Sequence, residues 1–126
     1  MAPLTQNPLQ GDILKYEANA NYSREQVTLL TGTNYVAGSV LGKITASGKY
    51  TLSPASGATG EETAIAVLLY DVDASAADQV AVVLARGPAI VSKAGLVFDA
   101  TVDQAAEITA KHDELVAVGI VPRDSA

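Results

Sequence analysis

Hydrophobic and polar residues alternate in short runs along most of the chain, a pattern typical of β-strands. Residues 27–30 form the first such run, and a turn-prone stretch follows them. Residues 35–45 and 49–52 are β-rich, and the short glycine-containing segment 46–48 between them predicts a hairpin. Residues 64–72 are nearly all apolar, which predicts a central strand buried on both faces. The pattern therefore predicts a sheet-based domain.

The second half of the chain contains the one segment with a helical period. Residues 101–104, Thr-Val-Asp-Gln, match a capping box, and apolar residues spaced three or four apart follow as far as Leu115. An acidic stretch over residues 71–78 predicts a turn whose aspartates bond to nearby backbone groups. Further short strands are predicted at residues 79–85, 89–91 and 119–121.

The first 22 residues lack a sustained period of either kind. They contain Pro3, Pro8 and scattered apolar residues, which predicts an extended arm over residues 1–22 ahead of a β-rich domain over residues 23–126. An extended arm can add a strand to the exposed sheet edge of a partner. Proline has no N–H to donate, so pairing is expected between or beside the two prolines.

Composition excludes several classes of function. The chain has 8 Lys and Arg against 14 Asp and Glu, and the resulting net charge of −6 opposes direct contact with nucleic acid. No stretch approaches the roughly 20 apolar residues of a membrane span, and no export signal is recognisable at the start. Cysteine is absent, which removes disulfides and thiolate ligands. Six aromatic residues without Trp make a deep ligand pocket improbable.

No convergent set of reactive side chains is recognisable, so we expect neither an enzyme nor a cofactor or metal site. His112 is the only histidine, no G-x-S-x-G motif accompanies it, and its neighbours Lys111, Asp113 and Glu114 are typical of a solvated helix end. Glu61 and Glu62 form an acidic pair that is better explained as solvated surface than as a general acid and base.

Two stretches partly match the motifs of ligand-binding loops but lack residues that those motifs require. Residues 71–75 begin like a calcium loop, but Ala76 stands where glycine is needed and Val82 where the last glutamate should ligate. Residues 42–50 approach a phosphate loop, but five residues separate the glycines and Tyr50 replaces the magnesium-binding hydroxyl. Both are predicted to be turns.

The ordered set of these segments resembles a known family. It comprises residues 37–44, Ala-Gly-Ser-Val-Leu-Gly-Lys-Ile, then the apolar run from Ala64, then Val80 to Val91 with its Arg-Gly-Pro-Ala. Over residues 23–121 the chain resembles the phage lambda-type head decoration proteins. The resemblance implies a small β-clip fold, three copies at each threefold site of an icosahedral head, and binding that follows expansion of the shell.

The resemblance also implies a role and its partners. It predicts a virion protein on the outer surface of the capsid, present in the host cytoplasm during assembly, that binds the major capsid protein and itself and resists pressure from packaged DNA. A β-rich adhesion or carbohydrate-binding module is the alternative, with few aromatic residues to support it. The arm residues predicted by position to contact the capsid are Leu4, Thr5, Pro8, Leu9, Ile13, Leu14 and Tyr16.

Overall fold

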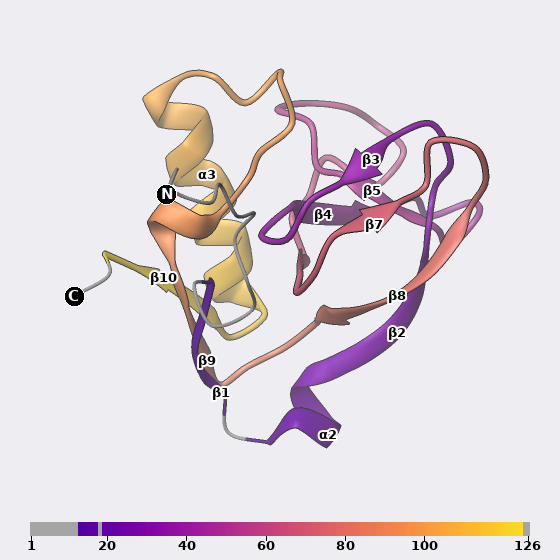
Figure 1. The fold of residues 1–126 in the computed structure, drawn as a ribbon. Coiled ribbons are helices and arrows are strands. Elements are labelled where there is room, and N and C mark those ends of the chain that lie inside the picture. Colours follow the sequence, from indigo (N-terminus) through magenta and orange to yellow (C-terminus); the bar gives the residue numbers. More distant parts are fainter. Residues whose placement is uncertain (1–12, 18, 125–126) are drawn as a thin grey trace, which may run out of the picture.

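The fold is mainly β, with one longer helix near the C-terminus, as the sequence predicts. A computed structural model describes residues 13–17 and 19–124 (Figure 1). Within these residues, two short helical segments, α2 (Ala20–Ser23) and η1 (Lys93–Gly95), accompany the helix α3 (Ala105–Ala117). The strands are β1 (Leu14–Glu17), β2 (Arg24–Leu29), β3 (Asn34–Tyr35), β4 (Val40–Lys43), β5 (Tyr50–Leu52), β6 (Ala66–Leu68), β7 (Val72–Asp73), β8 (Gln79–Leu84), β9 (Ala89–Ser92) and β10 (Ile120–Arg123).

Five strands close into a small barrel in the order β2-β5-β4-β6-β8. The longest pairing joins β2 and β8 in antiparallel register from Arg24↔Leu84 to Leu29↔Gln79. The pairing between β2 and β5, which closes the barrel, is much shorter: within the described residues these two strands pair only at Leu29↔Tyr50. Two tyrosines, Tyr35 and Tyr50, share the interior with small and branched side chains, which include Leu29, Leu41, Ala66, Leu68, Ala81 and Val83.

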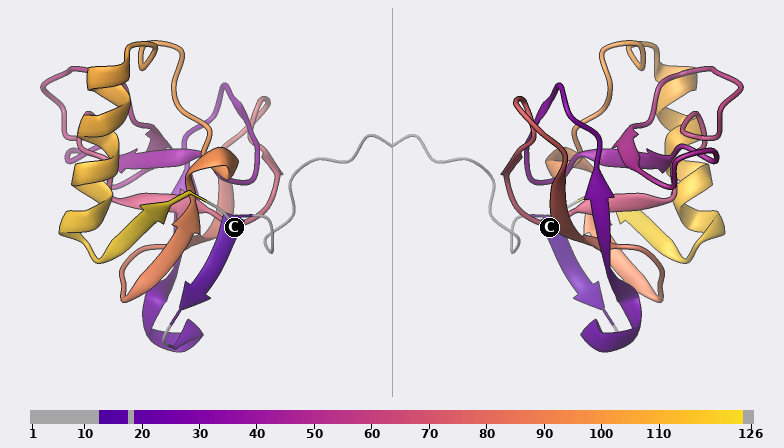
Figure 2. Two further views of the ribbon diagram at one scale, coloured as in Figure 1. Left: turned by 90° about the vertical axis from the view of Figure 1, so that its left-hand side faces the viewer. Right: turned by 90° about the vertical axis from the view of Figure 1, so that its right-hand side faces the viewer.

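A second sheet, in the order β1-β9-β10, lies beside the barrel and is covered by α3 (Figures 1 and 2). Its core takes in Ile13, Val91 and Leu115, and also Val40 and Val67 from barrel strands. Alternation along a strand sends successive side chains to opposite faces. The strands β4 and β6 therefore contribute to both cores at once, which explains why their sequences are almost continuously apolar.

The predicted strand 64–72 is shorter in the structure than in the sequence interpretation. Residues 66–68 form β6, and all three are buried, which confirms a strand covered on both faces. The chain then turns at Tyr70, and the Asp71 carboxylate accepts a hydrogen bond from the Ala37 N–H at 2.8 Å. The turn separates β6 from the short strand β7. The predicted strand was too long because apolar residues on both sides of β6 continue its hydrophobic pattern.

The hairpin predicted around residues 46–48 is confirmed, since β4 and β5 pair antiparallel from Leu41↔Leu52 to Lys43↔Tyr50. The imitation phosphate loop is therefore a turn between strands. Gly42 is required there by close packing, because a Cβ at this position would overlap the carbonyl of Glu61.

The helix exists as predicted, but its capping box lies three residues later. Gln104 is the N-cap, and its partner in the box is Glu107, whose carboxylate accepts a bond from the Gln104 N–H at 3.1 Å. Thr101 instead donates its hydroxyl proton to Asp99 at 2.6 Å, in the turn before the helix. The predicted start was wrong because two overlapping polar patterns both fit a capping box.

The last predicted strand is present as β10 and continues through Pro122. It pairs parallel to β9, from Ile120↔Ala89 to Arg123↔Ser92. Strand β10 is an edge strand of the sheet, where a residue without an N–H is tolerated. No helix within the described residues is long and apolar enough to cross a membrane.

Candidate functional site

The N-terminal strand β1 is the place where the folded domain meets the segment predicted to bind a partner. It pairs antiparallel with β9, with partners Leu14↔Val91, Tyr16↔Ile90 and Glu17↔Ala89. It forms one edge of its sheet. Whatever residues 1–12 contact, they join the domain through this strand.

The predicted contact residues fall into three groups. Leu4, Thr5, Pro8 and Leu9 lie outside the described residues. Ile13 is fully buried in the core, and Leu14 packs against the same core. Tyr16 is 52% exposed on the edge strand and is available to a partner.

This arrangement differs from the predicted boundary between arm and domain at residue 22. Residues 13–17 belong to the folded domain, because Ile13 fills the core and β1 bonds to β9. The sequence signal for this strand is weak, because it is only four residues long, too short for alternation to distinguish it from an extended arm. Of residues 13–17, only those with exposed side chains, such as Tyr16, can therefore contact a partner.

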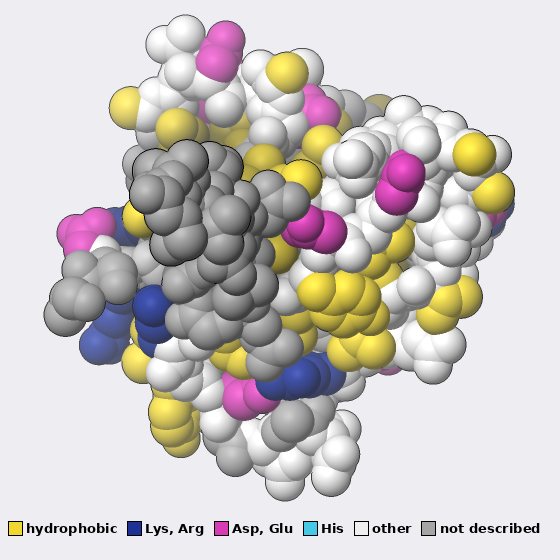
Figure 3. Space-filling model, in the orientation of Figure 1, with side chains coloured by type: hydrophobic (Ala, Val, Ile, Leu, Met, Phe, Trp, Pro, Cys, Tyr) yellow, Lys and Arg dark blue, Asp and Glu magenta, His cyan; other side chains and the backbone are white. Residues whose placement is uncertain are grey.

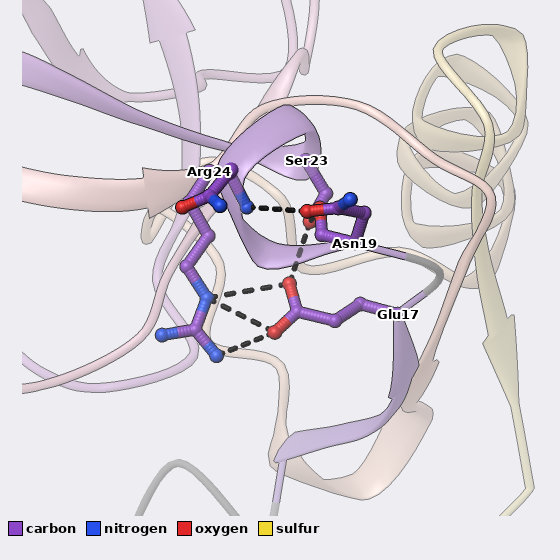
Figure 4. Close-up of polar contacts among 5 residues, drawn as sticks. Glu17, Asn19, Ser23 and Arg24 are labelled. Atoms are coloured by element: carbon purple, nitrogen blue, oxygen red, sulfur yellow. Dashed lines mark hydrogen bonds and ion pairs between the residues drawn. The ribbon is translucent and has the colours of Figure 1, made fainter.

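An ion pair between Glu17 and Arg24 joins the end of β1 to the start of β2 (Figure 4). Arg24 donates from Nη2 at 2.5 Å and from Nε at 3.1 Å to the same carboxylate oxygen, Glu17 Oε1. Ser23 Oγ donates to the other oxygen at 2.6 Å. The Arg24 guanidinium lowers the pKa of Glu17, against a smaller opposing effect of burial. The pair fixes β1 relative to the barrel.

A second basic residue continues this polar cluster toward β8. Arg86 donates to the Glu25 carboxylate at 3.0 Å and to the backbone oxygen of Tyr22 at 2.5 Å. Its guanidinium lies over the Tyr22 ring, 5.4 Å from the centroid. Tyr22 is itself 60% exposed, so it presents an aromatic surface whose orientation is fixed.

Hydrophobic side chains also gather over β7 and β8, on the face seen in Figure 3. Large exposed apolar residues of this part of the chain are Tyr70 just before β7 and Val80 within β8. The Tyr70 hydroxyl accepts a hydrogen bond from the Val82 N–H at 2.8 Å, a position on β8 that β6 does not reach. Tyr70 therefore covers part of a strand edge with its own side chain.

Asp73 and His112, two of the candidate reactive residues, contact neighbouring residues of the turn and of the helix region. Asp73 accepts bonds from the backbone and hydroxyl of Ser75, as expected for a turn. His112 lies against Phe98, with ring centroids 5.9 Å apart, and its Nε2 is buried without a hydrogen-bond partner in the described part of the chain. Burial, and then the charge of Lys93, lower the pKa of His112. Residues 13–17 and 19–124 contain no cluster of three acidic or histidine residues that could hold a metal ion.

The interpretation of residues 111–114 as a solvated helix end is wrong for Lys111. Its side chain is only 2% exposed. The ammonium group donates to Ser53 Oγ at 2.9 Å, to the backbone oxygen of Glu62, and to Glu114 Oε1 at 3.3 Å. Glu114 also accepts from the Ala64 N–H at 2.8 Å, so the helix is bonded to the loop before β6. Charge-rich local sequence gave no sign of this burial.

Comparison with known families shows which family the chain belongs to. The family model of the bacteriophage lambda head decoration protein D matches residues 3–120. The chain belongs to this family. A search of curated proteins gives no match.

The family match confirms the resemblance seen in the sequence and extends it. It begins at residue 3, so it includes most of the N-terminal segment, for which no matching motif could be quoted from sequence alone. The family is one of structural proteins that decorate phage capsids, which supports a capsid decoration role and a location on the virion capsid.

Proposed function

We propose that this protein binds the major capsid protein on the outer surface of an expanded phage head, as a β-clip homotrimer at each threefold site, after a period in the host cytoplasm. Bound there, it reinforces the shell against the pressure of packaged DNA. The observation that carries the proposal is the family match over residues 3–120, which includes both the N-terminal segment and the folded domain.

The N-terminal segment is proposed to supply the main contact with the capsid. Residues 1–12 precede a strand that is held by the core and by the Glu17–Arg24 ion pair. Leu4, Thr5, Pro8 and Leu9 would contact the capsid protein, with Tyr16 beside them on the folded edge. Ile13 and Leu14 would act from within the core, by fixing where the segment leaves the domain.

Three copies acting together would make this contact strong enough. Ordering an extended segment costs roughly 1–2 kcal/mol per residue, so a single segment binds weakly. Linking three segments in one trimer can raise apparent affinity by about 10²–10⁴. The net charge of −6 supports this arrangement, because it disfavours contact with the genome and helps keep the unassembled protein in solution.

Co-sedimentation with heads of the source phage tests the proposal. The full chain, a variant lacking residues 1–12, and the full-length variant Leu4→Asp with Leu9→Asp are mixed with expanded and unexpanded heads. We expect saturable binding of the full chain to expanded heads alone, at three copies per threefold site, and weak binding of both variants. Truncation before Ile13 retains every described core residue. Equal binding to both kinds of head, or none to either, would refute the proposal.

A further inference from the structure

The barrel strand β2 has an edge that is only partly paired. On one side it pairs with β8 along its whole length. On the other side it pairs with β5 at Leu29↔Tyr50 alone, as far as residues 13–17 and 19–124 extend. Residues 24–28 of this second edge therefore have no strand beside them among the residues that the structure describes.

The direction of the backbone groups follows from two hydrogen bonds. The Leu30 N–H donates to the Tyr50 carbonyl at 2.8 Å, toward β5, whereas the Ser23 carbonyl accepts from the Ala85 N–H at 2.8 Å, on the β8 side. Backbone groups alternate between the two edges from one residue to the next. Gln26 therefore directs its N–H and C=O to the same edge as Leu30, where β5 no longer runs.

A groove lies along this edge, between β2 and the β4–β5 hairpin. Its volume is about 480 Å³. Four consecutive residues of β2 line one side of it, and residues of the β4–β5 hairpin and of β8 line the rest. The lining residues are Glu25, Gln26, Val27, Thr28, Lys43, Gly48, Tyr50 and Val80. An extended peptide can enter such a groove and gain main-chain hydrogen bonds from the free edge.

The uncompensated charge of this groove is positive. Glu25 is already paired with Arg86 at 3.0 Å, and the neighbouring Lys49 is paired with Asp78 at 2.6 Å. Lys43 is exposed, and its ammonium group has no ion-pair partner among the described residues. In a chain with a net charge of −6, this free cation favours a segment that brings a carboxylate.

We propose that this groove receives an extended segment of the capsid shell protein, which adds as a strand beside Gln26 and places an acidic side chain next to Lys43. The inference rests on the proposed function, and it gives the folded domain a contact of its own with the shell. Residues 1–12 of another copy fit less well. Their single carboxylate, that of Asp12, adjoins Ile13, which is fixed in the core of its own domain.

Photo-crosslinking on the head tests which segment occupies the groove. A benzoylphenylalanine is placed at Gln26, or at the exposed Thr109 on α3 as a control, and each variant is bound to expanded heads and irradiated. We expect both variants to co-sediment, and the Gln26 variant alone to crosslink to an acidic segment of the capsid protein. Crosslinks from Gln26 to residues 1–12, or none, would refute the inference while head binding, and thus the proposed function, still stands.

Charge reversal provides an independent measurement. Lys43→Glu and Lys93→Glu change the net charge equally, and both lysines are exposed. We expect Lys43→Glu to weaken head binding by about five- to tenfold, and more so at low salt, because it replaces an attraction with a repulsion. Lys93→Glu should leave binding nearly unchanged. Equal effects of the two substitutions would contradict a specific role for Lys43.

Discussion

Replacing the buried Lys111 by methionine tests whether the helix α3 is fixed to the barrel by polar bonds. Lys111 is 2% exposed and donates to Ser53 Oγ at 2.9 Å and to the backbone oxygen of Glu62. Methionine keeps a similar unbranched stem, so packing is largely retained while all three donors are lost. Any loss of stability then reports mainly on the hydrogen bonds.

The expected magnitude follows from which groups lose a partner. Hydrogen bonds to a charged group contribute about 1.5–3 kcal/mol each, and leaving a buried acceptor unmet costs a comparable amount. The Glu114 side chain is 30% exposed and keeps its bond to the Ala64 N–H, so its share is small. We expect a loss of about 2–3 kcal/mol, below the roughly 3–5 kcal/mol for breaking a fully buried ion pair.

Urea unfolding followed by circular dichroism measures this free energy. Thr109→Met is the matched control, because Thr109 is exposed on the same helix two residues earlier, and its change should stay within about 0.5 kcal/mol. A Lys111→Met protein as stable as this control would refute the reasoning. It would mean that the free-energy cost of removing the ammonium group from water equals the stabilisation from its three hydrogen bonds.

Three further changes follow from the structure. Glu17→Gln should lower the free energy of unfolding by about 1 kcal/mol at pH 7, because it weakens the bond to Arg24. The native pKa of Glu17 is lowered, so the difference from wild type should shrink as pH falls below about 4.5 in a series of denaturation measurements. His112→Leu should remove a loss of stability that the wild type shows as pH falls below about 6.5, because burial lowers the native pKa and protonation favours unfolding; an unchanged slope between pH 7.5 and 5 would contradict this. Gly42→Ala should cost about 3 kcal/mol or more in urea titrations through overlap with backbone, whereas Gly57→Ala, where a Cβ meets only a flexible side chain, should cost under about 1 kcal/mol.

Much of the fold was predictable because local patterns agree with tertiary packing. The β4–β5 hairpin and the strands β2, β8 and β9 lie where alternation and turn residues indicate. The exact helix start was not predictable, since Thr101 and Gln104 both begin plausible capping boxes and only the packed structure chooses between them. Boundaries depend on such choices more than the existence of an element does.

The candidate site was less predictable, because its decisive features depend on contacts between distant residues. The burial of Ile13 requires β9 and a core assembled from residues far along the chain. Lys111 gives no local sign of burial, since its partners Ser53 and Glu62 lie in a loop about half the chain away. The open edge of β2 is likewise a property of the closed barrel and has no sequence pattern of its own.

The position of the Glu17–Arg24 ion pair bears on how a load on the N-terminal segment would reach the domain. Under the proposed function, tension from residues 1–12 acts first on β1, which has a single strand neighbour, β9, within residues 13–17 and 19–124. Three pairs of residues, interrupted by a register shift, form a short attachment, and the ion pair adds a direct connection from the end of β1 to β2. Because β2 pairs with β8 over six positions, the load passes into the longest pairing of the barrel. Glu17 and Arg24 should therefore matter more for retention on pressurised heads than their contribution to stability in solution suggests.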